Sequence, residues 1–425
     1  MTSCTKFIHA ADVHLDSPLD QLRRLDQSAA ARLQQASRRS LEKIVETALE
    51  HQVAAVLIAG DLFDGPVKDA GAGLWVDSQF KRLSRANIPV ILIRGNHDAQ
   101  SNARRVVHWS EGVHMLGTDQ PETRILDKVG LAIHGQSFGA RAETSDMAAA
   151  YPNPLSGYFN VGMLHTSLAG SSAHDVYAPT TVSALESKGY DYWALGHIHQ
   201  RSTSSLSSRC YIGFSGNTQG RHIREAGPRG FQLVQLADNH LTSVDFVASD
   251  SLRWHEVNLD LTEIDSLGEI EDLLQPLVEP LIEQADGRSL ALRIRLSGST
   301  SLHRSLTTLG TLDKLSETLS DRLGEFGEVW LEKVKLYTRP VESALAVELD
   351  LPLKYLGQVT EELIGDQGMH DQLLESLEEL FKKSRPELLP VNSPLVVDTA
   401  REVELLRLLQ SARDLVLSRL SSEAN

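Results

Sequence analysis

The sequence is poor in cysteine, in aromatic residues and in long apolar runs. Its 425 residues include two cysteines, Cys4 and Cys210, which are too few for a disulfide framework and lack the C-x-x-C spacing of a metal site. Aromatic residues make up 5% of the chain, which argues against a stacking platform for single-stranded nucleic acid. No stretch approaches the roughly 18 consecutive apolar residues that a membrane span needs. We therefore expect a reduced, cytoplasmic protein that does not enter a membrane.

Negative charge is concentrated in the rear of the chain. Of the net charge of −16, about −2 falls in residues 1–250 and about −14 in residues 251–425. The acidic rear should repel a polyanion, so any nucleic acid would be held by the front part or by a partner protein.

Short apolar runs alternate with amphipathic stretches in the first half of the chain. The amphipathic stretches, 29–51 and 70–87, have the spacing of helices. The apolar runs are typical of buried strands and lie at 6–11, 53–59 and 89–94. Further strand candidates follow at 129–134, 159–164 and 191–195. This order predicts parallel crossovers, and the strands expected between 201 and 247 look antiparallel. The fold class is thus α/β, with two sheets packed face to face and helices outside.

The sequence suggests three regions. Residues 1–250 should form the catalytic domain, and 251–340 a small α+β domain with helices at 264–286 and 311–324. Residues 341–425 read as mostly helical. The leucine-rich helix expected at 398–420 could dock on a partner coiled coil or pack against its own chain.

Five polar motifs follow strand candidates, where open α/β sheets place their ligands. They are Asp12-Val13-His14, Gly60-Asp61-Leu62-Phe63-Asp64, Gly95-Asn96-His97-Asp98, His165 and Gly196-His197-Ile198-His199. Each motif alone is weak, because such residues are common in turns and on surfaces. Five of them in order, each behind a strand-like run, predict one shared site.

The residue types suit a pair of metal ions. Two ions roughly 3.5–4 Å apart need a bridging carboxylate and several terminal donors, and Asp61 is the natural bridge. The other donors divide into Asp12, His14 and His199 for one ion and Asn96, His165 and His197 for the other. Two carboxylates against two divalent ions leave a positive surplus, which would attract a phosphate and lower the pKa of a water nucleophile. Such mixed donors are compatible with manganese, iron or zinc.

His97 is the candidate catalytic residue beside these ligands. It should protonate the leaving oxygen or stabilise the pentavalent transition state. Asp98 could hold its imidazole in one tautomer, and Asp64 is expected to orient a metal ligand. These three assignments predict a hydrolytic site.

A basic loop follows the last motif. It carries Arg221, His222, Arg224 and Arg229. Arg221 and Arg224 could contact the phosphate backbone of a nucleic acid, or the loop could be a solvated tip.

The motifs resemble those of the calcineurin-like metallophosphoesterases. Segments 7–18 and 190–199 are similar to the nuclease subunit of the SbcCD type of DNA repair exonuclease, and segment 216–222 resembles a bacterial YhaO-like branch. The resemblance spans about 5–236 and extends more weakly over the small domain.

The resemblance implies a four-layer αββα sandwich with a small α+β capping domain and C-terminal helices. It also implies two manganese ions on the seven ligands, His97 as the catalytic histidine, DNA as the substrate, a homodimer and an SbcC-like coiled-coil ATPase partner. Archaeal and eukaryotic relatives have a histidine where Asp64 stands, so the balance of exo- and endonuclease activity stays open. A phosphodiesterase or phosphatase acting on a small molecule or a protein is the alternative enzyme. A scaffold with a structural metal site is disfavoured, because it would not need His97.

Overall fold

The structure is a computed structural model of the chain. It describes residues 4–17, 35–65, 70–100, 109–168, 177–206 and 210–341, together with residue 359. The helix expected at 398–420 lies outside the described residues, as does the first part of the helix expected at 29–51. The chain divides into two compact units, Met1–Val257 with Pro276–Ile294 and Ser320–Lys333, and Asn258–Gln275 with Arg295–Leu319 and Val334–Asn425.

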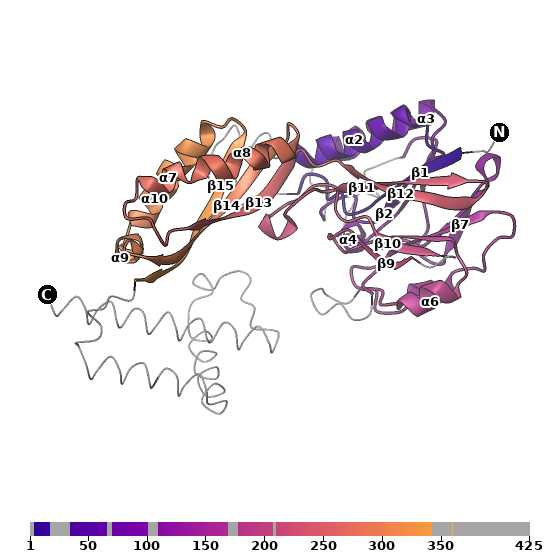
Figure 1. Cartoon of the computed structure of the whole chain (residues 1–425). Helices are drawn as coiled ribbons and strands as arrows, with labels where there is room; N and C mark the ends of the chain where they lie inside the picture. Colours follow the sequence, from indigo (N-terminus) through magenta and orange to yellow (C-terminus); the bar gives the residue numbers. More distant parts are fainter. Residues whose placement is uncertain are drawn as a thin grey trace. The chain divides into compact units, whose positions relative to one another are not determined.

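The first unit contains two six-stranded sheets (Figure 1). The first sheet has the order β12 (His240–Ala248), β11 (Gly230–Ala237), β1 (Cys4–Ala10), β2 (Ala55–Ala59), β3 (Val90–Ile93) and β4 (Val113–Met115). The second has the order β5 (Glu122–Leu126), β6 (Leu131–Gly135), β7 (Phe159–His165), β8 (Tyr192–Gly196), β10 (Tyr211–Phe214) and β9 (Ser202–Leu206). Strands β1 to β4 are parallel, and so are β6, β7, β8 and β10. Each parallel set therefore delivers its carboxyl ends to one edge of its sheet.

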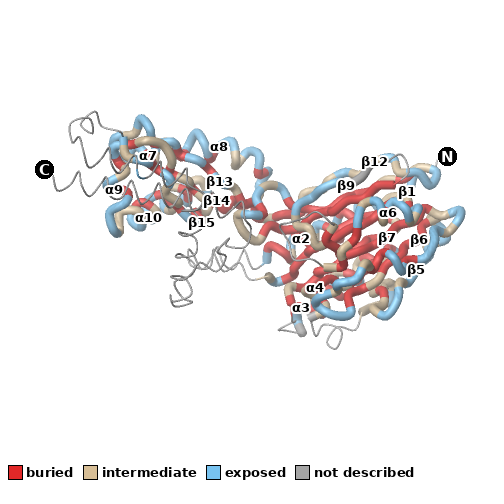
Figure 2. The backbone as a smooth tube through the Cα atoms, turned by 90° about the horizontal axis from the view of Figure 1, so that it is seen from below, coloured by how far each residue is buried: buried red, intermediate tan, exposed pale blue. Residues whose placement is uncertain are grey.

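Apolar side chains fill the space between the two sheets. Phe7, Leu57 and Ile91 of the first sheet join one core cluster with Val161 and Tyr192 of the second. Strands β2, β3, β7 and β8 are buried along their whole length, and Figure 2 shows β7 in red. Near-continuous apolar runs such as these belong to strands that are covered on both faces.

Helices cover the outer faces of both sheets. Helices α2 (Ala36–Glu50) and α3 (Ala70–Arg85) pack on the first sheet through residues such as Ile44 and Phe80. On the second sheet, α6 (Val182–Ser187) and the 3-10 turn η2 (Met147–Ala150) belong to the cluster around Trp193. The predicted α/β sandwich with outer helices is confirmed. Each helix among the described residues is too short or too polar to cross a bilayer.

Three features of the sandwich differ from the expectation. Strand β10 runs parallel to β8, although the strands after residue 200 look antiparallel in sequence. Strand β9 pairs antiparallel with β10, and β11 pairs antiparallel with both β1 and β12, as expected. Strands β4 and β5 were not predicted, because they are short and carry no buried apolar run.

A third sheet has three strands, β13 (Leu252–Asp260), β14 (Ser289–Thr300) and β15 (Val329–Pro340). The single helix expected at 264–286 is divided into α7 (Glu269–Asp272) and α8 (Leu274–Ala285). Pro276 explains the division, because it lacks the N–H that would bond to the Asp272 carbonyl in a continuous helix. Helix α10 (Thr311–Gly324) lies where it was expected, and α9 (His303–Thr307) is additional. The domain limits at 250 and 340 stay predictions.

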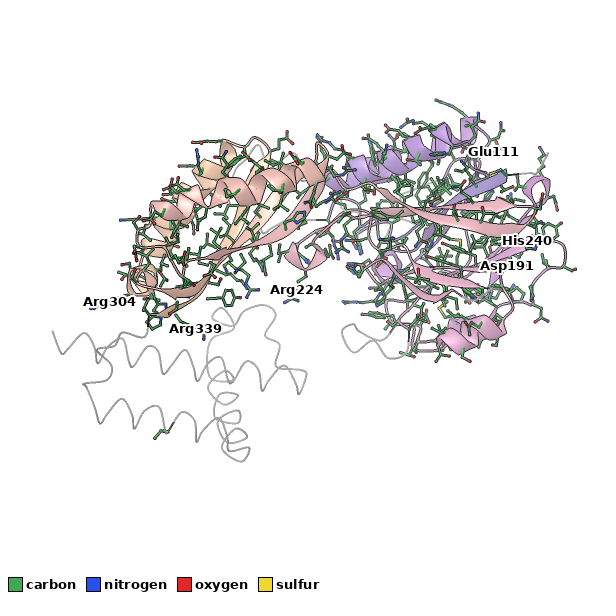
Figure 3. The ribbon with its side chains drawn as sticks, viewed as in Figure 1. Glu111, Asp191, Arg224, His240, Arg304 and Arg339 are labelled. Carbon is green, nitrogen blue, oxygen red and sulfur yellow. The ribbon has the colours of Figure 1, made fainter. Side chains whose placement is uncertain are left out.

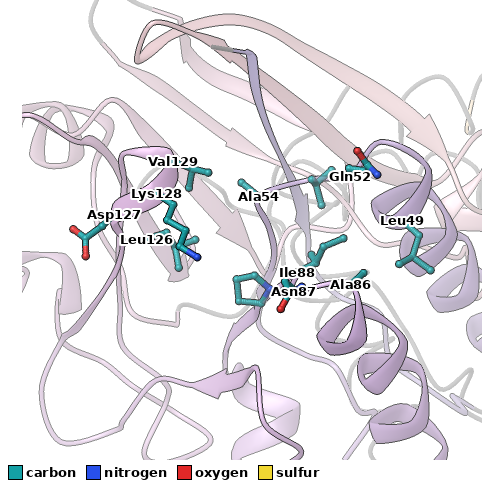
Figure 4. A pocket seen from close by; sticks show the side chains of 12 residues that line it. Leu49, Gln52, Ala54, Ala86, Asn87, Ile88, Leu126, Asp127, Lys128 and Val129 are labelled. Carbon is teal, nitrogen blue, oxygen red and sulfur yellow. The ribbon is translucent and has the colours of Figure 1, made fainter.

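A cavity of about 700 Å³ opens at the amino ends of β2 and β3 (Figure 4). The loops before these strands and the 3-10 turn η1 (Asp127–Val129) line it. The five polar motifs follow the carboxyl ends of their strands, so this cavity lies at the opposite edge of the sheets and none of the predicted ligands lines it.

Candidate metal centre

Backbone hydrogen bonds join the loops that carry the first two motifs. The N–H of Asp12 donates to Gly60 O at 3.0 Å, and the N–H of His14 donates to Asp61 O at 3.0 Å. The N–H of His197 reaches the Asp12 carboxylate, at 3.1 Å from Oδ1 and 3.0 Å from Oδ2. The loops after β1, β2 and β8 are thereby held as one surface.

Four non-glycine residues of this surface have left-handed backbone. The φ angles are 52° at Asp12, 46° at His14, 52° at Asp61 and 99° at His197. Such conformations cost on the order of 1–3 kcal/mol each and persist where the surroundings enforce them, which is common at functional sites.

The Asp61 carboxylate faces both sets of predicted ligands. Its Oδ2 lies 3.8 Å from His14 Nε2 and 3.4 Å from His165 Nε2. His14 Nε2 is in turn 3.1 Å from His199 Nε2, and His165 Nε2 is 3.0 Å from Asn96 Oδ1. This is the placement that a bridging carboxylate requires.

Asp12 and His197 complete the group of seven. Ligand atoms of Asp12, His14 and His199 lie within 4.8 Å of one another, and so do those of Asp12, Asp61 and His165. The ring centroid of His197 is 5.3 Å from that of His165. The structure thus brings all seven predicted ligands together.

A backbone hydrogen bond fixes the orientation of the His165 ring. His165 Nδ1 donates to Ala59 O at 3.0 Å, which leaves Nε2 toward Asp61. Burial lowers the pKa of His165, but Asp61 and Asp12 raise it, to about 9, so metal binding would displace a proton from this ring. Burial, with Arg221 beside it, lowers the pKa of His14 to about 3, which keeps that imidazole neutral.

The negative charge of the site favours the binding of cations. Asp12, Asp61, Asp64 and Glu225 bring four carboxylates together, and the Arg221 guanidinium contacts two of them. Asp12 and Asp61 are each 1% exposed, and burial raises the pKa of Asp12. Buried like charges are unfavourable by several kcal/mol unless they are compensated. Carboxylate, amide and imidazole donors around this charge fit two divalent metal ions.

Two glycines make room for this arrangement. A Cβ on Gly95 would lie 2.3 Å from Asp61 Oδ1 and 2.7 Å from His165 Nε2. A Cβ on Gly60 would lie 2.4 Å from His165 Nδ1, and the φ of Gly60 is +94°. Both positions therefore require a residue without a side chain.

His97 lies beside the ligands at the start of the short helix α4 (Asn96–Gln100). Its Nδ1 is 3.0 Å from Asp64 Oδ1, and this contact raises the pKa of His97. Asp64 also accepts from Ser17 Oγ at 2.7 Å and lies 3.3 Å from His14 Nδ1. Asp64 thus connects the candidate acid to a predicted metal ligand.

Asp98 does not orient His97, contrary to the expectation. It is buried and accepts three backbone N–H groups, from Leu62 at 3.1 Å, Phe63 at 2.9 Å and Gly95 at 3.3 Å. Burial raises its pKa to about 7. The Asp98 side chain turns back to its own loop, and Asp64 is the carboxylate that orients the His97 imidazole.

The basic loop after β10 contains both site residues and structural residues. Arg221 Nη1 is 3.5 Å from Asp64 Oδ1, so this side chain reaches the site. Arg229 is buried and donates to His199 O at 2.6 Å. Arg224 is exposed, and Figure 3 labels it.

Glu225 is the site residue that the sequence analysis missed. Its Oε1 accepts from His199 Nδ1 at 2.7 Å. An acid among basic residues, 26 positions from its partner, matches no local motif. The one available signal was its position four residues after Arg221, which is the spacing of an ion pair.

Two family models match parts of the chain. Residues 5–201 match the calcineurin-like phosphoesterase family, and residues 254–339 match the middle domain of the metallophosphoesterase YhaO. The chain belongs to the calcineurin-like metallophosphoesterases. It is 33% identical to the uncharacterized metallophosphoesterase YhaO of Bacillus subtilis, over 88% of this chain and 90% of that protein.

Two more distant relatives have names that refer to a nuclease or to DNA repair. The chain is 25% identical to a subunit of the nuclease SbcCD of Staphylococcus saprophyticus, over 59% of this chain and 71% of that protein. It is 26% identical to the DNA double-strand break repair protein Mre11 of Haloferax volcanii, over 55% of this chain and 49% of that protein.

Proposed function

We propose that this metallophosphoesterase is a two-metal nuclease that hydrolyses DNA phosphodiesters in repair or recombination, as an exonuclease, an endonuclease or both. The observation that carries the proposal is the Asp61 carboxylate between two sets of donors, with His97 beside it. The two relatives named for DNA work add support for the substrate class.

We propose two metal positions, one on each side of Asp61. Asp12, His14 and His199 would hold one ion, and Asn96, His165 and His197 the other. When bound, two divalent ions, which we propose are manganese, neutralise phosphate charge and lower the pKa of the attacking water. The buried carboxylates and the neutral His14 imidazole are donors that suit this task.

His97 would move the proton of the reaction. Its backbone N–H donates to Asp61 Oδ1 at 2.9 Å, which fixes the residue next to the proposed bridge. The contact with Asp64 favours the protonated imidazole, and the His97 side chain is 40% exposed, so an incoming substrate could reach it. We propose that this imidazolium donates its proton to the leaving alkoxide, and that Asp64 keeps the ring oriented.

The proposal extends to partners and location. An SbcC-like coiled-coil ATPase and a second copy of this chain are the proposed partners. The acidic rear of the sequence is a poor surface for DNA, which favours a different protein, such as the ATPase, that helps to hold it. The two cysteines are unbridged, which suits a cytoplasmic protein.

The test uses the purified full chain with Mn²⁺ and linear duplex DNA, with and without the ATPase. We expect degradation of the DNA. His97→Ala should abolish cleavage but retain both metal ions, whereas His51→Ala, at an exposed histidine, should leave cleavage unchanged. Hydrolysis of small phosphate esters without any cleavage of DNA would favour the alternative phosphodiesterase or phosphatase. No hydrolysis of either substrate would contradict the proposal.

A further inference from the structure

Glu225 is a buried acid that holds several parts of the centre at once. It ends the 3-10 turn η3 (Ile223–Glu225) and is 4% exposed. Its Oε1 accepts from His199 Nδ1 at 2.7 Å. Its Oε2 accepts from Asn217 Nδ2 at 2.8 Å and from the backbone N–H of Arg221 at 2.7 Å. Both carboxylate oxygens accept hydrogen bonds, and these bonds hold the Glu225 side chain in one position.

The contact with His199 sets the state of that imidazole. His199 Nδ1 lies 2.7 Å from Glu225 Oε1, and an ionised carboxylate can only accept, so the ring carries a proton on Nδ1. Its Nε2 faces His14 Nε2, at 3.1 Å. Carboxylates behind metal-binding histidines act in this way and strengthen the metal site.

The Arg221 guanidinium is directed into the same region but is not satisfied there. Its Nη1 is 3.5 Å from Asp64 Oδ1, and its Nη2 is 3.3 Å from His199 Nδ1 and 3.6 Å from Glu225 Oε1. Good charge-assisted hydrogen bonds are about 2.7–2.9 Å long. Arg221 Nε is buried and has no hydrogen-bond partner within the described part of the chain. The two Nη groups make only these long contacts, so they are the donors that a ligand could take.

The position of the Arg221 guanidinium favours an oxyanion as its ligand. Asp64 Oδ1 lies near His97 Nδ1, His14 Nδ1 and Arg221 Nη1, so the guanidinium is close to the candidate acid and to one predicted metal ligand. An oxyanion at the metal centre would meet this planar fork, whose geometry matches phosphate oxygens. Backbone anchoring by Glu225 pre-organises the side chain for that contact.

We propose that Arg221 binds the non-bridging oxygens of the substrate's reacting phosphate, and that Glu225 is a positioning residue that couples Arg221 to the metal ligand His199. The inference rests on the proposed phosphoesterase site and adds a substrate contact to it. Arg224, three residues further along the chain, is exposed, and we assign it no contact with the reacting phosphate.

The test measures binding of inorganic phosphate to the Mn²⁺-loaded full chain by calorimetry, separately from Mn²⁺ binding and from turnover. Arg221→Gln should weaken phosphate binding by roughly tenfold or more, because a charge-assisted contact is lost, while Mn²⁺ affinity changes little. Arg221→Lys should restore part of the loss. Arg224→Gln, the matched control, should behave like the parent protein.

Glu225→Gln should weaken Mn²⁺ binding by about 10- to 100-fold as well as phosphate binding, since His199 loses its carboxylate partner. If that variant does not fold, Glu225→Asp, which keeps the charge but shortens the reach, should still weaken both.

Three results would overturn the inference. They are equal phosphate affinity of Arg221→Gln and Arg224→Gln, unchanged Mn²⁺ affinity after both Glu225 substitutions, and absence of phosphate binding by the parent protein. If the parent protein cleaves DNA but Arg221→Gln binds phosphate as tightly as the parent, this inference fails and the proposed function stands. Arg221-dependent phosphate binding without any DNA cleavage would remove the proposed DNA substrate and leave the phosphate contact standing.

Discussion

Replacement of Gly95 by alanine would insert a methyl group into the metal centre. The new Cβ would lie 2.3 Å from Asp61 Oδ1 and 2.7 Å from His165 Nε2. Ordinary contacts of such atoms begin near 3.4 Å, so the Asp61 carboxylate would have to move by about 1 Å. A misplacement of about 1 Å in a catalytic site costs on the order of a hundredfold in rate, or about 2.7 kcal/mol.

The assay for Gly95→Ala is hydrolysis of a phosphodiester by the Mn²⁺-loaded full chain, together with a Mn²⁺ binding isotherm. We expect a loss of kcat/KM of about a hundredfold and weaker binding of at least one ion. Gly139→Ala is the matched control, because a Cβ there meets its nearest atom, Glu143 Oε1, at an ordinary 3.4 Å. If Gly95→Ala kept the activity and metal affinity of the control, the inferred crowding around Asp61 would be refuted.

The remaining predictions concern the metal and the loops. Asp61→Ala should lower bound Mn²⁺ from two ions to fewer than one per chain by elemental analysis, and a retained pair would contradict the bridging role. Asp98→Ala should lower the free energy of unfolding in urea by roughly 3 kcal/mol or more, because three buried N–H groups lose their acceptor. The exposed control Asp119→Ala should change it by less than about 0.5 kcal/mol. Saturation with Mn²⁺ at a hundred times its dissociation constant should stabilise the parent by about 2.7 kcal/mol for each bound ion, and an unchanged melting temperature after chelation would contradict metal binding by the folded chain.

The sequence was sufficient for those parts of the fold that local patterns determine. Strands β2 and β3 are continuous apolar runs, and α3 has a clear helical spacing. The motifs behind the strands could be grouped, because the carboxyl ends of parallel strands meet at one edge. Local sequence patterns do not determine which distant strands pair with one another. The parallel pairing of β10 with β8 was therefore missed.

Side-chain direction was the part of the site that spacing could not determine. Asp98 directly follows His97, but its side chain returns to the N–H of Gly95 and to the neighbouring loop. Asp64, 33 positions away, reaches the imidazole instead. Glu225 was missed for the same reason, since its contact with His199 depends on how the loop after β10 folds back. Only the three-dimensional arrangement of the loops settles such contacts.

The most direct test of the two-metal centre is anomalous X-ray scattering at the manganese edge from crystals of the full chain grown with Mn²⁺. We predict two peaks roughly 3.5–4 Å apart, with the Asp61 carboxylate in contact with both. A single peak, or a second ion that Asp61 does not touch, would contradict this account.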